Sequence, residues 1–177
     1  IRRSMGVDEA AITAEQVVSR RMYARIRQGD SLGGVREARE LVRLQLAVLP
    51  EAQRAAVGDP DSAGAAAVRQ LFSPWMRFFI TCDPRPVLRR VTCPVLAING
   101  GRDLQVLPRE NLDAIEAALR AGGNRDAVVK ELPGLNHLFQ TCRLCTIAEY
   151  AQLEETIAPA ALDEMTRWIL AHTTGKR

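Results

Sequence analysis

Asp103 and His137 are the two residues of this chain whose types and spacing point to joint chemistry. Each follows a short apolar segment and a tight turn that contains glycine. A carboxylate beside an imidazole can fix the imidazole tautomer and stabilise the imidazolium ion. A histidine held in this way can accept the proton of a hydroxyl nucleophile. The two residues are therefore the candidate acid and base of one catalytic site.

The elements that must position this pair form a predicted strand–helix–strand unit. Residues 94–99 are a continuous apolar run, which is typical of a buried parallel strand, and residues 127–132 predict the next strand. Pro108 opens a predicted helix between them that runs to Arg120. Functional side chains of parallel sheets gather at the carboxyl ends of the strands, so the pair should meet there. Two strands make an incomplete sheet, and they are expected to pair with strands that this chain does not contain.

A last helix is predicted from Pro159 to Ala171, and the region 1–82 predicts a separate helical segment. Thr13 and Gln16 fit a capping box at the start of its first helix. A second helix is expected over residues 35–49, and the composition of 58–64 predicts a loop. Two further features are expected here, an N-cap and first helical turn at Ser73-Pro74 and a group of aromatic residues on that turn, Trp75, Phe78 and Phe79.

Composition argues against two classes of partner. The 24 basic and 21 acidic residues nearly balance, and no basic stripe carries interleaved aromatics, so we expect no nucleic-acid binding. No apolar run approaches the roughly 20 residues of a membrane span, so we expect none. The sequence assigns no compartment.

The four cysteines are expected to be reduced thiols. Cys142 and Cys145 form a C-x-x-C motif. A zinc site of this type requires a second closely spaced pair of cysteines, and Cys82 and Cys93 lie too far apart in the sequence to form one. The motif follows a loop, which disfavours a redox pair of the kind that follows the first strand of a β-α-β unit. His172 is expected to lie at a frayed, solvated end. No metal and no cofactor is predicted.

The segments around the candidate pair resemble those of the α/β-hydrolase superfamily. Residues 93–106, CPVLAINGGRDLQV, are similar to the strand and loop that carry the acid in that family, with a proline following at 108. Residues 132–140, LPGLNHLFQ, are similar to its histidine loop. Four further short segments resemble, more narrowly, bacterial serine esterases of the dienelactone-hydrolase or acyl-peptidase-like branch. They are Ser73-Pro74-Trp75, Asp83-Pro84-Arg85-Pro86, Ala148-Glu149-Tyr150 and Glu154-Glu155-Thr156.

The resemblance, which extends from about Phe72 to Ile169, implies a triad in the chain order Ser, Asp, His, with Asp103 and His137 as its last two members. The nucleophile of this fold lies in a G-x-S-x-G elbow between a strand and a helix. Residues 29–33 match that pattern literally, but the predicted helix before them leaves no place for the strand. Ser31 is therefore not expected to be the nucleophile, which is expected upstream of Ile1.

The implied fold class is α/β, the C-terminal part of an α/β-hydrolase core over residues 83–177, preceded by a helical cap or lid over 1–82. The implied activity of the parent protein is hydrolysis of a small-molecule carboxylic ester through a serine acyl-enzyme, and this chain alone is expected to be inactive. The aromatic group on the cap is expected either to line the substrate pocket or to pack the cap onto the core.

Three alternatives stay open. The same fold also serves amide and peptide hydrolases. A second possibility is a non-catalytic binding module of the α/β-hydrolase type, or a stable piece that associates with another chain through its exposed strand edge. Self-association through that edge is possible in either case. An unrelated doubly wound domain is the third, although Gly100-Gly101 has no further glycine at phosphate-loop spacing.

Overall fold

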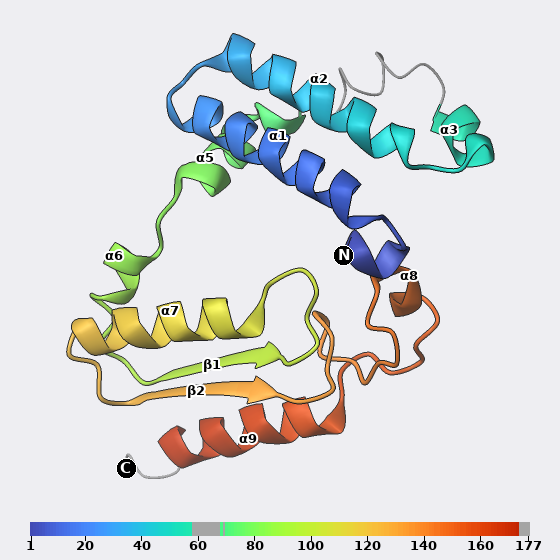
Figure 1. Ribbon diagram of the computed structural model, residues 1–177. Helices are drawn as coiled ribbons and strands as arrows, with labels where there is room; N and C mark the ends of the chain where they lie inside the picture. Colours follow the sequence, from blue (N-terminus) through green and yellow to red (C-terminus); the bar gives the residue numbers. More distant parts are fainter. Residues whose placement is uncertain (58–67, 69, 174–177) are drawn as a thin grey trace. The chain divides into compact units, whose positions relative to one another are not determined.

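The computed structural model describes residues 1–57, 68 and 70–173, and it is a mixed α/β protein (Figure 1). The chain divides into two compact units. One is helical and runs from Arg2 to Cys82; the other begins at Asp83, runs to the C-terminus and includes Ile1. The division lies at the Asp-Pro-Arg-Pro segment where the character of the sequence changes.

The helical unit is built on two helices that pack against each other, α1 (Glu9–Arg27) and α2 (Ser31–Ala47) (Figure 1). Its core contains Met22, Ile26, Ala38 and Val68, all buried. Burial of these apolar side chains is the main force that holds the helices together. The other described elements of the unit are η1 (Arg3–Met5), α3 (Glu51–Val57) and α5 (Pro74–Thr81).

Capping side chains set where these helices begin. The capping box predicted at Thr13 is wrong, because the carboxylate of Asp8 already accepts the backbone N–H groups of Ala10 and Ala11 and starts α1 five residues earlier. Asp30 caps α2 in the same way through the N–H of Gly33, so that helix begins at Ser31 rather than at 35. The predicted N-cap at Ser73 is confirmed, since its hydroxyl accepts the N–H of Met76. The loop predicted over 58–64 lies outside the described residues.

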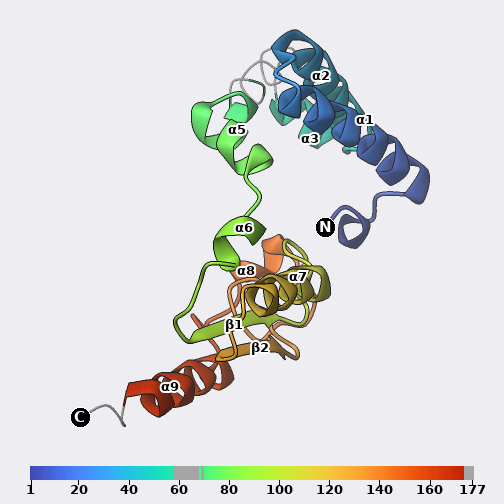
Figure 2. The same ribbon diagram turned by 90° about the vertical axis from the view of Figure 1, so that its left-hand side faces the viewer.

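The second unit contains the predicted strand–helix–strand motif. Strands β1 (Val95–Gly100) and β2 (Ala127–Leu132) pair in parallel and in register from Val95 with Ala127 to Gly100 with Leu132. Helix α7 (Pro108–Ala121) connects them and covers one face, while α9 (Pro159–Thr173) covers the other (Figures 1 and 2). Two short helices complete the described part of this unit, α6 (Arg85–Leu88) and α8 (Ile147–Tyr150).

The sheet is open in the described part of the chain. β1 and β2 each have one hydrogen-bonded partner there, so each strand has one unpaired edge. The burial expected for both strands is reached only at some positions; Val128 remains 38% exposed. Unpaired edges and exposed apolar side chains are a surface that can pair with further strands. Self-association through these edges stays a prediction.

None of the helices in the described ranges combines the length and the apolar character needed to cross a bilayer.

Candidate active site

Asp103 and His137 come together at the carboxyl ends of the two strands. Asp103 lies three residues beyond the end of β1, and His137 lies five residues beyond the end of β2. Nδ1 of His137 is 2.8 Å from Oδ2 of Asp103. The structure thus joins two side chains that are 34 residues apart in the sequence.

Backbone contacts hold the two loops against each other. The N–H of Gly101 donates to the carbonyl oxygen of Leu132 at 2.8 Å, and the N–H of Arg102 donates to that of Leu135 at 3.0 Å. A Cβ atom on Gly100 would lie 2.3 Å from the carbonyl oxygen of Asn136, nearer than any side chain tolerates. The absence of a side chain at position 100 therefore permits the approach that brings the acid to the base.

The carboxylate of Asp103 is buried, with 5% of the residue exposed, and it is saturated with hydrogen bonds. Oδ1 accepts the backbone N–H groups of Gln105 and Val106 at 2.8 and 2.9 Å. Oδ2 accepts Nδ2 of Asn99 at 3.1 Å and contacts His137. Desolvation, the largest single effect, raises the pKa of Asp103, but the donors at Val106, His137 and Gln105 together hold that pKa below its usual value.

The contact with Asp103 orients the imidazole of His137. An ionised carboxylate can only accept, so the hydrogen bond to Asp103 places the proton of the neutral ring on Nδ1 and leaves Nε2 with a lone pair. No residue of the described ranges is hydrogen-bonded to Nε2. The His137 side chain is 37% exposed against 4% for Asp103. The buried acid thus holds the ring, and Nε2 is free to meet a hydroxyl group.

Asn99, the penultimate residue of β1, supports the acid, and sequence reasoning missed it. Besides its bond to Asp103, its Nδ2 donates to the carbonyl oxygen of Val106 at 3.3 Å, and its Oδ1 accepts Nδ2 of Asn111 at 2.9 Å. The residue is 5% exposed. The available signal was an amide side chain at the end of an otherwise apolar strand, because a buried amide needs several partners.

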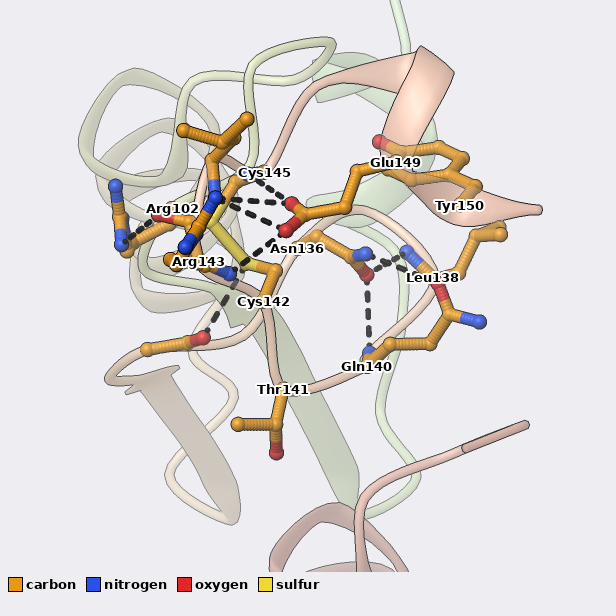
Figure 3. Close-up of a disulfide and its surroundings, with 12 residues drawn as sticks. Arg102, Asn136, Leu138, Gln140, Thr141, Cys142, Arg143, Cys145, Glu149 and Tyr150 are labelled. Carbon is orange, nitrogen blue, oxygen red and sulfur yellow. Dashed lines mark hydrogen bonds between the residues drawn. A yellow bond between two sulfur atoms is a disulfide. The ribbon is translucent and has the colours of Figure 1, made fainter. Parts of the chain in front are cut away.

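Asn136 fixes the loop of the base in a comparable way (Figure 3). It is fully buried, and its Oδ1 accepts the backbone N–H groups of Leu138 and Gln140 at 2.9 and 3.0 Å. Its Nδ2 donates to Oε1 of Gln140. Phe139, between these partners, has a φ of 58°, and its carbonyl oxygen accepts the N–H of Ala158 at 2.8 Å. The backbone around the base is therefore held by side-chain and main-chain contacts rather than left mobile.

The predicted substrate-contacting residues Trp75, Phe78 and Phe79 lie on α5, in the helical unit. All three are exposed, and the rings of Trp75 and Phe79 are stacked with centroids 5.5 Å apart. Phe78 also lines a surface hollow with Phe72, Pro74, Arg77 and Thr81. Asp103 and His137 belong to the other unit, so both predicted roles of these aromatics, pocket lining and packing onto the core, stay predictions.

No serine in the described parts of the chain lies in a G-x-S-x-G elbow between a strand and a helix. Residues 83–177 contain no serine. Ser31 is the first residue of α2 and follows α1, not a strand, with Gly29 at a φ of 75° between the two helices. The literal G-x-S-x-G match is thus a turn between helices.

The expectation of reduced thiols is wrong for one pair. Cys142 and Cys145 form a disulfide, whereas Cys82 and Cys93 are free and exposed. The physical reason is the left-handed backbone of Cys145, φ 60°, within a turn that brings the two Cα atoms to 5.0 Å. No group of three or more His, Cys, Asp or Glu side chains among the described residues is arranged to hold a metal.

The expectation of a solvated His172 is also wrong. Its ring is tilted against Trp168 with centroids 4.3 Å apart, and its Nδ1 is 2.7 Å from the carbonyl oxygen of that residue. Its Nε2 is 3.1 Å from Oδ1 of Asp126, just before β2. Both nitrogens are engaged, and the contact lies at the end of the sheet opposite to Asp103. This second His–Asp contact joins α9 to the sheet.

No similarity to a known protein bears on the function of this chain, so any functional proposal rests on the geometry of Asp103 and His137 and on the sequence segments around them. No protein-family model matches this chain, and neither the curated proteins nor the solved structures contain a match to it.

Proposed function

We propose that this chain carries the acid and base of a serine hydrolase that cleaves carboxylic esters. The observation that carries the proposal is the 2.8 Å contact between the buried carboxylate of Asp103 and the accessible imidazole of His137. Its place at the carboxyl ends of adjacent parallel strands is where sites of open α/β sheets are found. The resemblance of residues 93–106 and 132–140 to the acid and histidine loops of α/β-hydrolases supports the same reading.

In the proposed reaction, Nε2 of His137 takes the proton of a serine hydroxyl as the serine oxygen attacks the ester carbonyl. Asp103 stabilises the resulting imidazolium without taking the proton itself. The imidazolium then protonates the departing alkoxide, and an acyl-serine remains. Water attacks the acyl group with His137 again as base, and the proton returns to the serine oxygen when the carboxylic acid leaves.

The proposal places the serine outside residues 1–177. The unit that holds Asp103 and His137 contains no serine beyond residue 83, and Ser31 lacks the strand that an elbow requires. The amide of the residue after the nucleophile is normally one donor of the oxyanion hole, so this hole also belongs to other sequence. These 177 residues alone are therefore expected to be inactive.

The test is hydrolysis of p-nitrophenyl acetate and butyrate by the natural protein that contains this chain. We expect His137→Ala and Asp103→Asn each to lower kcat by about 10⁴–10⁶-fold, since loss of the base or of its orientation has effects of this order in serine hydrolases. His172→Ala and Asp126→Asn are the matched controls, because they break the other His–Asp contact of the same unit. These two variants should keep kcat within a few-fold.

The outcomes separate the alternatives. An unchanged rate in His137→Ala would show that the base is misassigned. Cleavage of p-nitroanilides in preference to the esters would instead assign the site to an amide or peptide hydrolase. Absence of hydrolysis of both substrate classes by the natural protein would favour the non-catalytic binding module.

A further inference from the structure

A disulfide between Cys142 and Cys145 closes a tight turn in the segment between β2 and α8 (Figure 3). Cys145 has a φ of 60°, in the left-handed region that residues other than glycine avoid. The carboxylate of Glu149 accepts the backbone N–H groups of Arg143, Leu144 and Cys145. The disulfide and the carboxylate thus hold Cys145 in a conformation that its local sequence disfavours.

The turn contacts the loop that carries the acid. Nη1 of Arg102 donates to the carbonyl oxygen of Arg143 at 3.0 Å, and Nε2 of Gln105 donates to the hydroxyl of Tyr150 at 3.1 Å. Arg102 directly precedes Asp103, and the backbone N–H of Gln105 donates to the carboxylate of Asp103. Of the two side chains that flank the acid, Arg102 is therefore attached to the segment that the disulfide closes, and Gln105 to the last residue of α8, which follows that segment.

The turn also contacts the loop that carries the base. Sγ of Cys142 is 3.4 Å from the carbonyl oxygen of Gly134, in the turn that leads from β2 to His137. A disulfide sulfur has no proton to donate, whereas a thiol at this position has one. Opening of the disulfide therefore changes a contact on the base side as well as on the acid side.

The two sulfur-bearing residues differ in accessibility. Cys145 is 1% exposed, while Cys142 is only partly buried. Thiol–disulfide exchange needs an attacking thiolate to reach one sulfur in line with the bond. Cys142 is therefore the residue that an external thiolate attacks, and Cys145 is the leaving thiolate.

We propose that the Cys142–Cys145 disulfide is a reversible redox-modification site, opened by a dithiol reductant, and that its opening loosens the positioning of Asp103 and His137. A thiolate of the reductant bonds to Sγ of Cys142, the intramolecular S–S bond breaks, and Cys145 leaves as a thiolate and takes up a proton. The second thiol of the reductant then displaces Cys142. The reductant ends as its own disulfide, and the protein gains two electrons and two protons as two thiols.

The first test follows the sulfurs in the natural protein with dithiothreitol as the dithiol. Iodoacetamide should alkylate Cys82 and Cys93 with or without reductant, because both are free and exposed. Cys142 and Cys145 should be alkylated only after reduction, with Cys142 reacting first. Alkylation of Cys142 and Cys145 without reductant, or their resistance to dithiothreitol in the folded protein, would overturn the proposal.

The second test follows the site by amide hydrogen exchange before and after reduction. We expect reduction to accelerate exchange at least tenfold at Gln105 and Val106, whose N–H groups bind Asp103, and across residues 143–145. Exchange in the helical unit should not change, and it is the internal reference. Equal exchange of residues 105 and 106 in the oxidised and reduced protein would overturn the link to the acid.

Paired variants separate the disulfide from the backbone conformation that it holds. In the double variant Cys142→Ser/Cys145→Ala, the amide hydrogens of Gln105 and Val106 should exchange fast without reductant, as they do in the reduced protein. Cys142→Ser with Cys145→Gly should exchange more slowly, because glycine accepts a φ of 60° without the disulfide. Identical exchange in the two double variants would contradict the proposed role of Cys145. The effect on catalysis rests on the proposed hydrolase function, but alkylation and exchange do not, so the two proposals can fail separately.

Discussion

The close approach of the acid and base loops at Gly100 gives the most specific structural prediction. In Gly100→Ala, the new Cβ atom would lie 2.3 Å from the carbonyl oxygen of Asn136 and 2.5 Å from that of Leu135. Both are backbone atoms of the loop that carries His137, so neither can rotate away. Relief requires the loop to move until these distances reach at least 3.0 Å.

Gly101→Ala is the matched control. There the nearest atom to the new Cβ is Oε1 of Glu131 at 2.7 Å, at the end of an exposed, flexible side chain. The nearest backbone atom, the carbonyl oxygen of Leu132, is 3.3 Å away, which needs a much smaller adjustment. Neither glycine has a positive φ, so the two variants differ in steric contact and not in backbone preference.

The expected magnitudes follow from two opposed effects. Where the folded structure accepts the added methyl group, replacement of glycine by alanine raises the free energy of unfolding by about 0.4–1 kcal/mol, because it lowers the conformational entropy of the unfolded chain. Overpacking against atoms that cannot retreat costs about 1–3 kcal/mol, occasionally more. We therefore expect Gly100→Ala to lower the free energy of unfolding by roughly 1–3 kcal/mol. Gly101→Ala should change it by less than about 0.5 kcal/mol.

Urea denaturation in a Trp75→Phe background measures this, because Trp168 in α9 then reports on the α/β unit alone. With a urea m-value of about 1–3 kcal/mol/M, a loss of 2 kcal/mol moves the midpoint by about 1 M. The ester hydrolysis proposed for the natural protein should also fall in Gly100→Ala by about 10-fold or more, since displacements near 1 Å can cost about 100-fold. Equal midpoints for Gly100→Ala and Gly101→Ala would refute the close approach of the two loops.

Three further predictions concern the acid and the helical core. Asn99→Ala removes a donor to Asp103 and leaves the half-buried Nδ2 of Asn111 unpaired, so the free energy of unfolding should fall by about 2–4 kcal/mol in urea titrations. The lowered pKa of Asp103 adds stability above the ordinary aspartate pKa of about 3.9, and this is lost as the pH falls through the lower folded-state pKa. Urea midpoints measured from pH 5 to pH 2.5 should therefore fall more steeply in the wild type than in Asp103→Asn, and parallel curves would contradict the assignment. Met22→Ala should cost about 2–5 kcal/mol by calorimetry, whereas Leu32→Ala, at a position 81% exposed, should stay within about 0.5 kcal/mol.

The α/β unit could be predicted where local sequence determines local structure. The apolar run before Gly100, the proline at 108 and the Pro-Gly turn at 133 each mark an element boundary within one or two residues of the observed one. Because parallel strands align their carboxyl ends, these boundaries were enough to predict that Asp103 and His137 would lie near each other.

Features that depend on backbone conformation or distant contacts could not be predicted in this way. The disulfide depends on a left-handed φ at Cys145, which a sequence without glycine at that position does not indicate. The contact of His172 with Asp126 joins residues 46 apart and forms only once α9 has packed on the sheet. The support from Asn99 was hidden because the residue was counted as part of an apolar strand.

The start of α1 shows a different limit. Thr13 and Gln16 satisfy the capping-box pattern, but Asp8 is also a favoured N-cap residue, and the helix capped by Asp8 gains an additional turn. Thr13 then lies inside the helix, where its hydroxyl donates to the carbonyl oxygen of Glu9. Competition between two valid caps is decided by the longer helix and its packing, which the local pattern does not contain.

The central claim is that Asp103 and His137 activate a serine nucleophile, and a fluorophosphonate probe tests it most directly. Such a probe phosphonylates a serine whose hydroxyl is activated by an adjacent base. In the natural protein, tandem mass spectrometry should find one labelled serine, in a G-x-S-x-G elbow outside residues 1–177. Labelling should be lost in His137→Ala and retained in His172→Ala. Undiminished labelling in His137→Ala, or phosphonylation of Ser31, would contradict the account.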